Sequence, residues 1–161
     1  MRYFLSLGSN LGDRAHNLEQ ALSFLKKEKI KILKSSSLYE TQPVDYLQQP
    51  EFYNQVIEVE TGLKPLDLLD LIKNIEAKMG RKVKAWKGPR IIDIDILLAE
   101  DFVLSTARLT IPHPRLHQRN FVLIPLAEIS PDSGHPLLKK TIKELLESSK
   151  DKAKVTKINN L

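Results

Sequence analysis

The sequence predicts an α+β fold, with helices packed on a mainly antiparallel β-sheet. Apolar residues alternate in some segments of the chain and recur every three or four residues in others. The predicted elements follow the order strand–helix–strand–strand–helix–strand. No repeat, low-complexity tract or long linker interrupts the 161 residues, so we expect residues 1–161 to form a single domain.

The first part of the chain contains one predicted helix among three predicted strands. β-branched and aromatic residues mark the strands, which cover residues 2–7, 30–39 and 54–61. The helix is expected to begin at an N-cap, Asp13, because apolar residues then recur at helical spacing: Leu18, Leu22 and Leu25. A polar loop that contains proline, residues 41–50, separates the second strand from the third.

A second long helix is predicted next, since Pro65 suits its first turn and Gly80 suits its end. Apolar patterns beyond it predict a strand, a hairpin and two helices, over residues 91–98, 103–111, 121–129 and 141–148 respectively. The tail after Lys150 is either disordered or a short strand at residues 155–158. This order of elements is that of a ferredoxin-like sandwich, and we expect the helices on one face of the sheet.

Composition excludes several classes of protein. There is no cysteine, so neither a disulfide framework nor a cysteine-ligated metal is possible. Hydrophobic residues make up 42% and charged residues 28%, which indicates a folded soluble domain rather than a disordered chain. The N-terminus lacks the apolar core of a signal peptide, and the apolar run at residues 121–129 is too short to cross a bilayer. We therefore expect a cytoplasmic protein without a membrane partner.

The net charge of +5 is compatible with a nucleic acid, an anionic lipid or a polyanionic small molecule as partner. Part of the surplus lies in residues 139–157, which we expect to be a solvated helix and tail. A second concentration, residues 78–90, directly precedes a pair of carboxylates. The location of this second cluster favours a polyanionic ligand.

Asp93 and Asp95 lie two positions apart on a predicted strand, so their side chains point to the same face. The two like charges repel, and a bound divalent cation would remove that cost. Magnesium prefers oxygen ligands and usually shares itself with substrate phosphates, so the pair suits a magnesium–polyphosphate site. The alternative is a charged face on an edge strand, which discourages aggregation. No Walker-type loop is present, so side chains would have to hold the phosphates.

A turn rich in proline and basic residues follows the predicted hairpin. Pro112 and Pro114 restrict the backbone around His113, as suits a side chain that must be aimed. Arg119 can form a forked contact with a phosphate, and His113 can donate a hydrogen bond to one. The alternative is a basic surface turn without a ligand. A histidine metal site is disfavoured, because no second ligand lies at a usual spacing.

Several short motifs occur in one order along the chain: residues 8–13, 39–44, 49–54, 80–81, 88–90, 93–98 and 112–116, with Arg119, Phe121, Pro125 and Leu126. Together they resemble the 6-hydroxymethyl-7,8-dihydropterin pyrophosphokinase family of folate biosynthesis. Each motif alone is weak, but this many in the same order is specific. The resemblance extends from the start of the chain to about residue 136.

The resemblance implies a ferredoxin-like monomer that binds MgATP before a dihydropterin. The pterin hydroxyl would attack the β-phosphorus, giving AMP and the pterin diphosphate, which is the reaction of a 2-amino-4-hydroxy-6-hydroxymethyldihydropteridine diphosphokinase. Asp93 and Asp95 would hold two magnesium ions and, with Arg81 and Arg90, would form the catalytic set. The residues implied around ATP are Lys73, Glu76, Arg81, Lys84, Arg90, Ile96, His113 and Arg119. Those implied around the pterin are Thr41, Pro43, Val44, Phe52, Asn54 and Phe121.

The chemistry of these residues suits the implied roles. Phe52 and Phe121 can hold a flat heterocycle, and Asn54 offers its edge a donor and an acceptor. Positioning and charge neutralisation do most of the work in phosphoryl transfer, so no general base is assigned. The chain differs from the family pattern at Asp45, where glycine is common, and at Trp86, which does not directly precede Gly88.

Two other functions are compatible with some of these residues. A nucleic-acid-binding module would suit the basic charge, but it predicts aromatic residues in an RNP-like motif, which the chain lacks. Another magnesium enzyme, such as a nucleotidyltransferase or nuclease, would use the same carboxylate pair. Release of AMP or of inorganic pyrophosphate from ATP distinguishes that alternative from a pyrophosphokinase.

Overall fold

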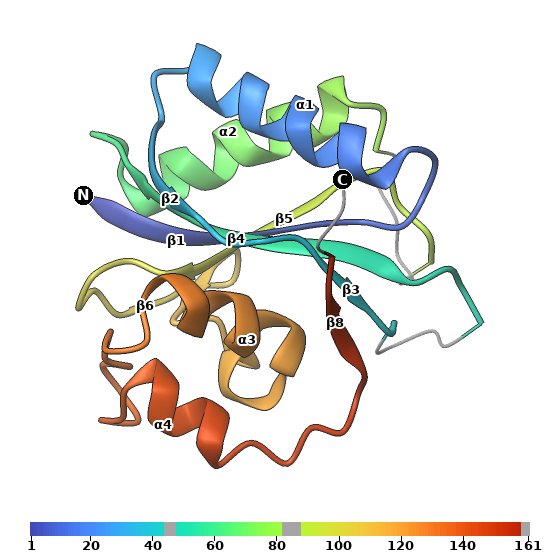
Figure 1. The fold of residues 1–161 in the computed structure, drawn as a ribbon. Coiled ribbons are helices and arrows are strands. Elements are labelled where there is room, and N and C mark those ends of the chain that lie inside the picture. Colours follow the sequence, from blue (N-terminus) through green and yellow to red (C-terminus); the bar gives the residue numbers. More distant parts are fainter. Residues whose placement is uncertain (44–47, 82–87, 159–161) are drawn as a thin grey trace.

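The structure is a computed structural model that describes residues 1–43, 48–81 and 88–158. Its centre is a six-stranded sheet with the strand order β5-β1-β4-β3-β8, in which β2 also pairs with β4 (Figure 1). The strands are β1 (Arg2–Ser9), β2 (Lys31–Ser35), β3 (Tyr39–Thr41), β4 (Phe52–Glu60), β5 (Asp93–Leu98) and β8 (Val155–Lys157). All the pairings are antiparallel.

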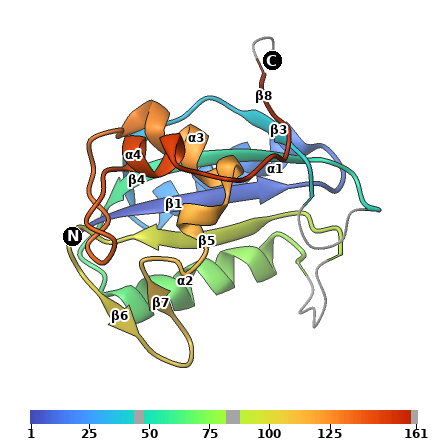
Figure 2. The same cartoon turned by 90° about the horizontal axis from the view of Figure 1, so that it is seen from below.

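The other elements are four α-helices, a single 3-10 turn and a small hairpin within the described residues. They are α1 (Arg14–Lys27), α2 (Pro65–Lys78), α3 (Asn120–Ile129), α4 (Ile142–Glu147), the turn Leu116–Gln118, β6 (Leu104–Ser105) and β7 (Thr110–Ile111). The hairpin lies near α2 at one side of the sheet (Figure 2). In the part of the chain that is described, no helix is long and apolar enough to cross a membrane.

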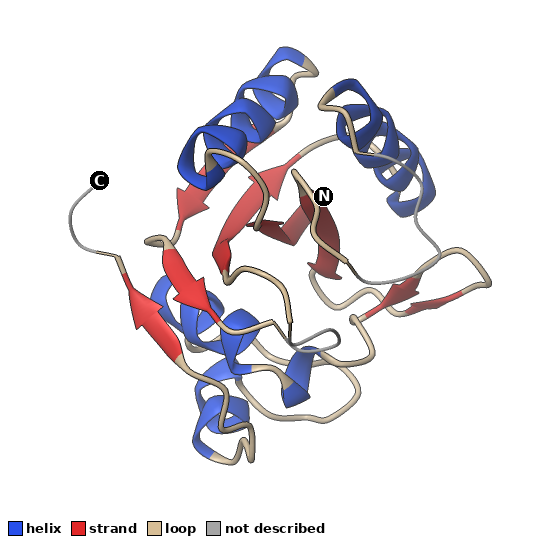
Figure 3. Cartoon of the chain, turned by 90° about the vertical axis from the view of Figure 1, so that its right-hand side faces the viewer, coloured by secondary structure: helices blue, strands red, loops and turns tan. Residues whose placement is uncertain are grey.

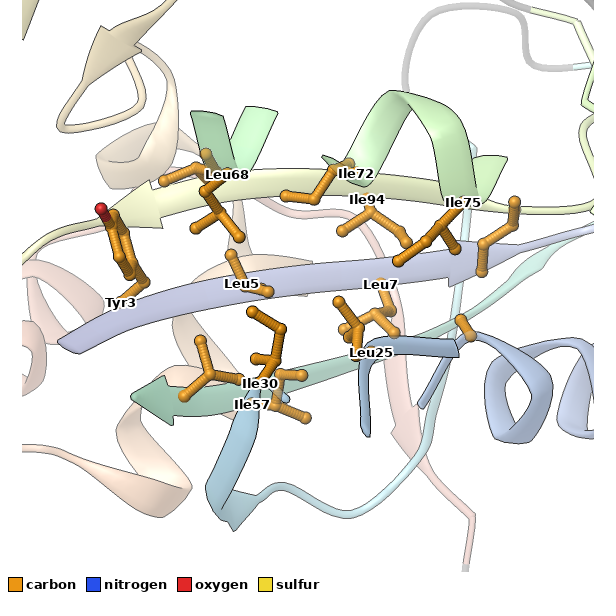
Figure 4. Packing of buried hydrophobic residues seen from close by; sticks show 14 of the residues in the cluster. Tyr3, Leu5, Leu7, Leu25, Ile30, Ile57, Leu68, Ile72, Ile75 and Ile94 are labelled. Carbon is orange, nitrogen blue, oxygen red and sulfur yellow. The ribbon is translucent and has the colours of Figure 1, made fainter. Parts of the chain in front are cut away.

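Helices cover both faces of the sheet, with α1 and α2 on one face and α3 and α4 on the other (Figures 1 and 3). The predicted α+β class is confirmed, but the expectation that the helices lie on one face is wrong. The reason lies in the central strands. Leu5 and Leu7 of β1 belong to the core under α1 and α2, together with Leu68 (Figure 4). Phe4 belongs to the second core, with Leu123 of α3. A sheet with two apolar faces needs a layer of structure on each.

Local sequence signals correctly mark the ends of the first two helices. Asp13 is the N-cap of α1, and its carboxylate accepts a hydrogen bond from the backbone N–H of His16 at 3.1 Å. Pro65 occupies the first turn of α2. Gly80 follows α2 with φ of 90°, a left-handed conformation that glycine adopts without steric cost.

The predicted strand over residues 30–39 is two strands, β2 and β3, which pair with different parts of β4. The register of β2 shifts between Ile32 and Lys34. Beyond β2, the Ser36 hydroxyl accepts a hydrogen bond from the backbone N–H of Val56 at 3.0 Å. The Ser36 side chain thus accepts the hydrogen bond that a backbone carbonyl would accept in a regular ladder. The β2–β4 ladder is therefore interrupted before β3 begins.

The tail adopts the short strand that was one of its two expected states. β8 pairs with β3 at the edge of the sheet (Figure 2). The Ile158 N–H donates to the carbonyl of Leu38 at 2.9 Å, and the Lys154 N–H donates to Oε1 of Gln42 at 2.8 Å. The tail therefore covers the open edge of β3.

Glu128 of α3 connects the helix to the sheet. Its carboxylate accepts from the N–H and hydroxyl of Ser37, at 3.0 and 2.8 Å, and from the hydroxyl of Tyr39 at 2.7 Å. Burial raises the pKa of the Glu128 carboxyl, but these hydrogen bonds more than offset it, so the pKa lies below its ordinary value.

Glu128→Gln should lower the free energy of unfolding by about 1 kcal/mol at pH 7, because the charged acceptor is lost. A depressed folded-state pKa stabilises the fold above the ordinary pKa of glutamate, about 4.3, and this contribution is lost as the pH falls through the folded-state value. The difference between the two proteins should therefore shrink from pH 6 to pH 3 in urea titrations. Glu19→Gln, on the exposed face of α1, serves as the control. A difference independent of pH would contradict the assigned cause.

Candidate active site

Asp93 and Asp95 lie on β5, and alternation places them on one face of the sheet. Both line a pocket on the α3 side, whereas Ile94 and Ile96 belong to the core under α1 and α2. The predicted same-face arrangement of the two carboxylates is therefore present.

Asp93 is held by two arginines. Its Oδ1 lies 2.9 Å from Nη1 of Arg81, and its Oδ2 lies 3.3 Å from Nη1 of Arg90. Arg81 also pairs with Glu76 of α2 at 2.7 Å, and Glu76, only 3% exposed, accepts from the N–H of Ile94 at 2.8 Å. Burial lowers the pKa of Arg81, but Asp93 and Glu76 more than offset this and hold it above its usual value. The network joins the end of α2 to the start of β5.

Asp95 is in a different electrostatic environment. Burial raises its pKa to about 7, with further contributions from Asp93 and Glu76 that exceed the opposing effect of Lys73 and Arg81. The ionised carboxylate therefore lacks sufficient positive charge around it. A divalent cation would supply that charge.

The donor set fits magnesium better than a metal that needs a protein cage. Among the residues described, no three histidine, cysteine, aspartate or glutamate side chains are grouped so as to hold a metal. Magnesium usually takes one or two carboxylates and completes its octahedron with water and substrate phosphates. Asp93 and Asp95 match that limited requirement.

Five of the six residues expected around the pterin line one pocket with the carboxylates, and the sixth, Val44, lies outside the described residues. The pocket is lined by Thr41, Pro43, Phe52, Asn54 and Phe121, together with Ser6, Gly8, Gln42, Gln49, Arg90, Asp93, Asp95 and Arg119. Buried Asn54 donates from Nδ2 to the hydroxyl of Thr41, which fixes the orientation of its amide. The guanidinium of Arg90 lies 5.3 Å from the centre of the Phe52 ring, and that of Arg119 lies 5.6 Å from the Phe121 ring. The pocket thus combines aromatic faces, an oriented amide and cations.

A second groove adjoins the pocket at Asp95. It contains Lys73, Ile96 and His113, which were expected around ATP, and also Leu69, Ile94, Thr106, Ala107, Arg108, Leu109, Thr110 and Pro114. Burial lowers the pKa of His113 to about 4, assisted by Arg119 and Arg115 against the opposing effect of Asp93. Nδ1 of His113 accepts from the N–H of Arg115 at 3.1 Å. A neutral His113 therefore carries its proton on Nε2, as a hydrogen-bond donor.

Comparison with known proteins identifies the family. The profile of a family described as 7,8-dihydro-6-hydroxymethylpterin-pyrophosphokinase (HPPK) matches residues 4–131. This chain belongs to the HPPK family. A protein named 2-amino-4-hydroxy-6-hydroxymethyldihydropteridine pyrophosphokinase from Bacillus subtilis is 45% identical over 127 residues, which are 78% of this chain and 76% of that protein. The protein of the same name from Aquifex aeolicus is 43% identical over 141 residues, 88% of each chain. These matches support pyrophosphoryl transfer in folate biosynthesis.

Some HPPK relatives are much longer. The folic acid synthesis protein fol1 of Schizosaccharomyces pombe is 47% identical over 145 residues, which are 89% of this chain but only 20% of that protein. A crystal structure of Plasmodium falciparum HPPK-DHPS, wild type with pteroate, aligns with a TM-score of 0.73 at 20% identity, covering 91% of this chain and 44% of that one. At that identity, the structural match supports the fold alone.

The HPPK-derived expectations for single residues divide into three groups. Arg90 and Arg119, expected around ATP, instead line the pocket that contains Phe52 and Asp93. Glu76, also expected around ATP, is enclosed by Arg81, Lys73 and the β5 backbone. Its position therefore suits it to hold Arg81 rather than to contact a ligand. Val44 and Lys84 lie outside the described residues, as do the two departures from the family pattern, Asp45 and Trp86.

Sequence reasoning missed residues of the hairpin and of the first turn that line or support the candidate site. Arg108 and Thr110 line the groove, and Arg108 is tied to Asp70 of α2 by an ion pair. The sequence predicts the hairpin, but no local sequence pattern indicates that it lies against α2. Buried Asn10 accepts from the N–H of Arg90 at 2.8 Å and donates to the carbonyl of Pro50 at 3.0 Å. The sequence signal for Asn10 was its position in the first family motif, residues 8–13.

Gly8, which lines the pocket, gives a test of the expected pterin contact of Asn54. A Cβ at Gly8 would lie 2.6 Å from Oδ1 of Asn54 and would displace the amide that Thr41 orients. Gly8→Ala should therefore raise KM for the pterin by about 10-fold, because a small misplacement of a binding group is costly. KM for ATP should change little. Gly62→Ala is the matched control, since nothing lies within 4 Å of a Cβ there. Equal KM values in the wild type and in Gly8→Ala would exclude Asn54 as a pterin contact.

Proposed function

We propose that the chain transfers diphosphate from MgATP to the hydroxymethyl group of 6-hydroxymethyl-7,8-dihydropterin. The hydroxyl oxygen forms a bond to the β-phosphorus while the bond from that phosphorus to the α,β-bridging oxygen breaks. AMP leaves with the bridging oxygen, and the hydroxyl proton passes to solvent. The supporting observation is the position of Asp95, which lines both the aromatic pocket and the groove with His113. The two substrates would thus meet at this carboxylate.

Asp93 and Asp95 are the residues that would hold magnesium. When bound, two Mg²⁺ ions supply charge neutralisation for the triphosphate and for the attacking oxygen. Arg81 orients Asp93 from one side and Arg90 from the other. Arg90 and Arg119 also add positive charge close to the transferred group, which favours the transition state.

The remaining residues bind and orient the substrates. Phe52 and Phe121 enclose the pterin ring, with Asn54 and Thr41 at its polar edge. Lys73, Ile96 and neutral His113 hold the nucleotide, and the Nε2 proton of His113 is available to a phosphate oxygen. Positioning and charge neutralisation suffice for this reaction, so no side chain is assigned as general base.

We further propose that residues 1–161 act as one domain and as a monomer in the cytoplasm, with small molecules rather than nucleic acid as partners. Size-exclusion chromatography with light scattering should give one species close to the chain mass of 18.4 kDa. A stable dimer at micromolar concentration would contradict the monomer.

The deciding experiment mixes the protein with ATP, Mg²⁺ and 6-hydroxymethyl-7,8-dihydropterin and follows nucleotides by chromatography. AMP should form only when pterin and metal are both present, and no inorganic pyrophosphate should appear. Pterin-independent release of pyrophosphate would identify a nucleotidyltransferase instead. Binding of ATP without any turnover would refute the proposed reaction.

A further inference from the structure

Arg14 lies on the side of the sheet opposite the pterin pocket, at the first position of α1. Asp13 caps the helix directly before it, and Asn17 donates from Nδ2 to the carbonyl of Leu11 at 2.8 Å. The start of α1 is thus fixed to the turn after β1. Arg14 projects from this fixed point toward β3 and β4.

Three contacts with described residues hold the Arg14 guanidinium. Its Nη1 lies 2.8 Å from Oε2 of Glu40 and donates to the carbonyl of Glu51 at 3.0 Å. The guanidinium carbon lies 3.8 Å from the centre of the Tyr53 ring. The Arg14 and Glu40 side chains are 26% and 32% exposed, so this is not a freely solvated ion pair.

The contacts of Arg14 are with residues that stand next to Thr41 and Phe52 in the chain, and Thr41 and Phe52 line the pocket. Glu40 and Tyr53 are directly opposite each other in the β3–β4 ladder, and the next pair is Thr41 and Phe52. Successive side chains of a strand point to opposite faces. Thr41 and Phe52 therefore face the pocket while their neighbours face Arg14.

We propose that Arg14 is a positioning residue for the pterin pocket, acting from the opposite face of the sheet on the backbone that presents Thr41 and Phe52. This inference rests on the proposed function of that pocket. The planar guanidinium can pair with a carboxylate, donate to a carbonyl and stack on a ring at the same time, whereas a lysine ammonium cannot reproduce all three contacts. Among the described residues, the partners of Arg14 are Glu40, Glu51 and Tyr53, and none of them lines the groove that contains His113.

The test compares steady-state kinetics for Arg14→Met, Arg14→Lys and wild type. Arg14→Met should raise KM for the pterin about 10-fold, because the pocket wall is no longer held in place, and KM for ATP should stay within about twofold. Arg14→Lys should recover part of the loss. Arg2→Met is the matched control, since it breaks an exposed ion pair with Glu60 on the same sheet, and it should leave both KM values unchanged.

Hydrogen exchange gives a readout that does not depend on turnover. Arg14→Met should speed amide exchange in residues 39–41 and 52–54 more than in β5. A purely structural role would instead lower the melting temperature and leave the ratio of the two KM values unaltered, and that result would overturn the proposal. Absence of AMP formation by the wild type would refute the proposed function, whereas the exchange pattern would still report on the contacts of Arg14.

Discussion

Replacing Asp95 by asparagine is expected to lower kcat by roughly 1,000-fold, because one of two carboxylates that would hold magnesium at the transferred phosphates becomes a neutral amide. Asparagine has nearly the same shape, so packing is retained. It also removes a like charge beside Asp93, and burial already disfavours the ionised form of Asp95. The melting temperature should therefore be equal to or higher than that of the wild type. Such an exchange of stability for activity is typical of a functional carboxylate.

The measurement is initial-rate AMP formation at saturating ATP, pterin and Mg²⁺, with thermal melting of the same samples. Asp101→Asn is the control, because Asp101 is exposed just beyond β5 and lines neither the pocket nor the groove. It should retain wild-type kcat. Near-normal turnover by Asp95→Asn would remove Asp95 from the reaction and would favour the alternative of a charged edge strand.

Features of the fold that depend on a few consecutive residues were predictable. Asp13, Pro65 and Gly80 act through local geometry, so they mark helix ends correctly. The division of residues 30–39 was not predictable, because it depends on the Ser36 hydroxyl bonding to a different strand. The position of α3 was also missed, since Phe4, Val56 and Leu98 form the second apolar face only when β1, β4 and β5 are assembled into the sheet.

In the candidate site too, local features were predictable from the sequence, whereas features that depend on tertiary contacts were not. Strand alternation is enough to place Asp93 and Asp95 together. The Glu76–Arg81–Asp93 network joins a helix end to a strand start, so residue spacing does not reveal that Glu76 is buried under Arg81. Arg108 reaches the groove only because the hairpin packs near α2. These residues belong to the site because of contacts between segments that are far apart in the sequence, and a local sequence pattern does not reveal such contacts.

Arg81→Met should affect both stability and turnover. It leaves Glu76, 3% exposed, without its closest cation. Loss of one partner from a buried ion pair is expected to lower the free energy of unfolding by about 3 kcal/mol. Asp93 loses one of its two arginines as well, so kcat should fall by about 100-fold. Urea titrations and AMP assays measure the two effects. Arg2→Met, which breaks an exposed pair, should cost less than about 1 kcal/mol.

The double variant Arg81→Met/Glu76→Gln separates the two roles. Glutamine removes the unpaired buried charge, and its amide oxygen can still accept from the N–H of Ile94, so most of the lost stability should return. Turnover should remain low, because Asp93 still lacks Arg81 and the transferred phosphates lack its charge. Recovery of turnover together with stability would mean that Arg81 serves only to neutralise Glu76. Persistent low turnover in a stable protein would show that Arg81 is needed for the reaction, by orienting Asp93 or through its own charge, with Glu76 as the buried anion that holds it in position.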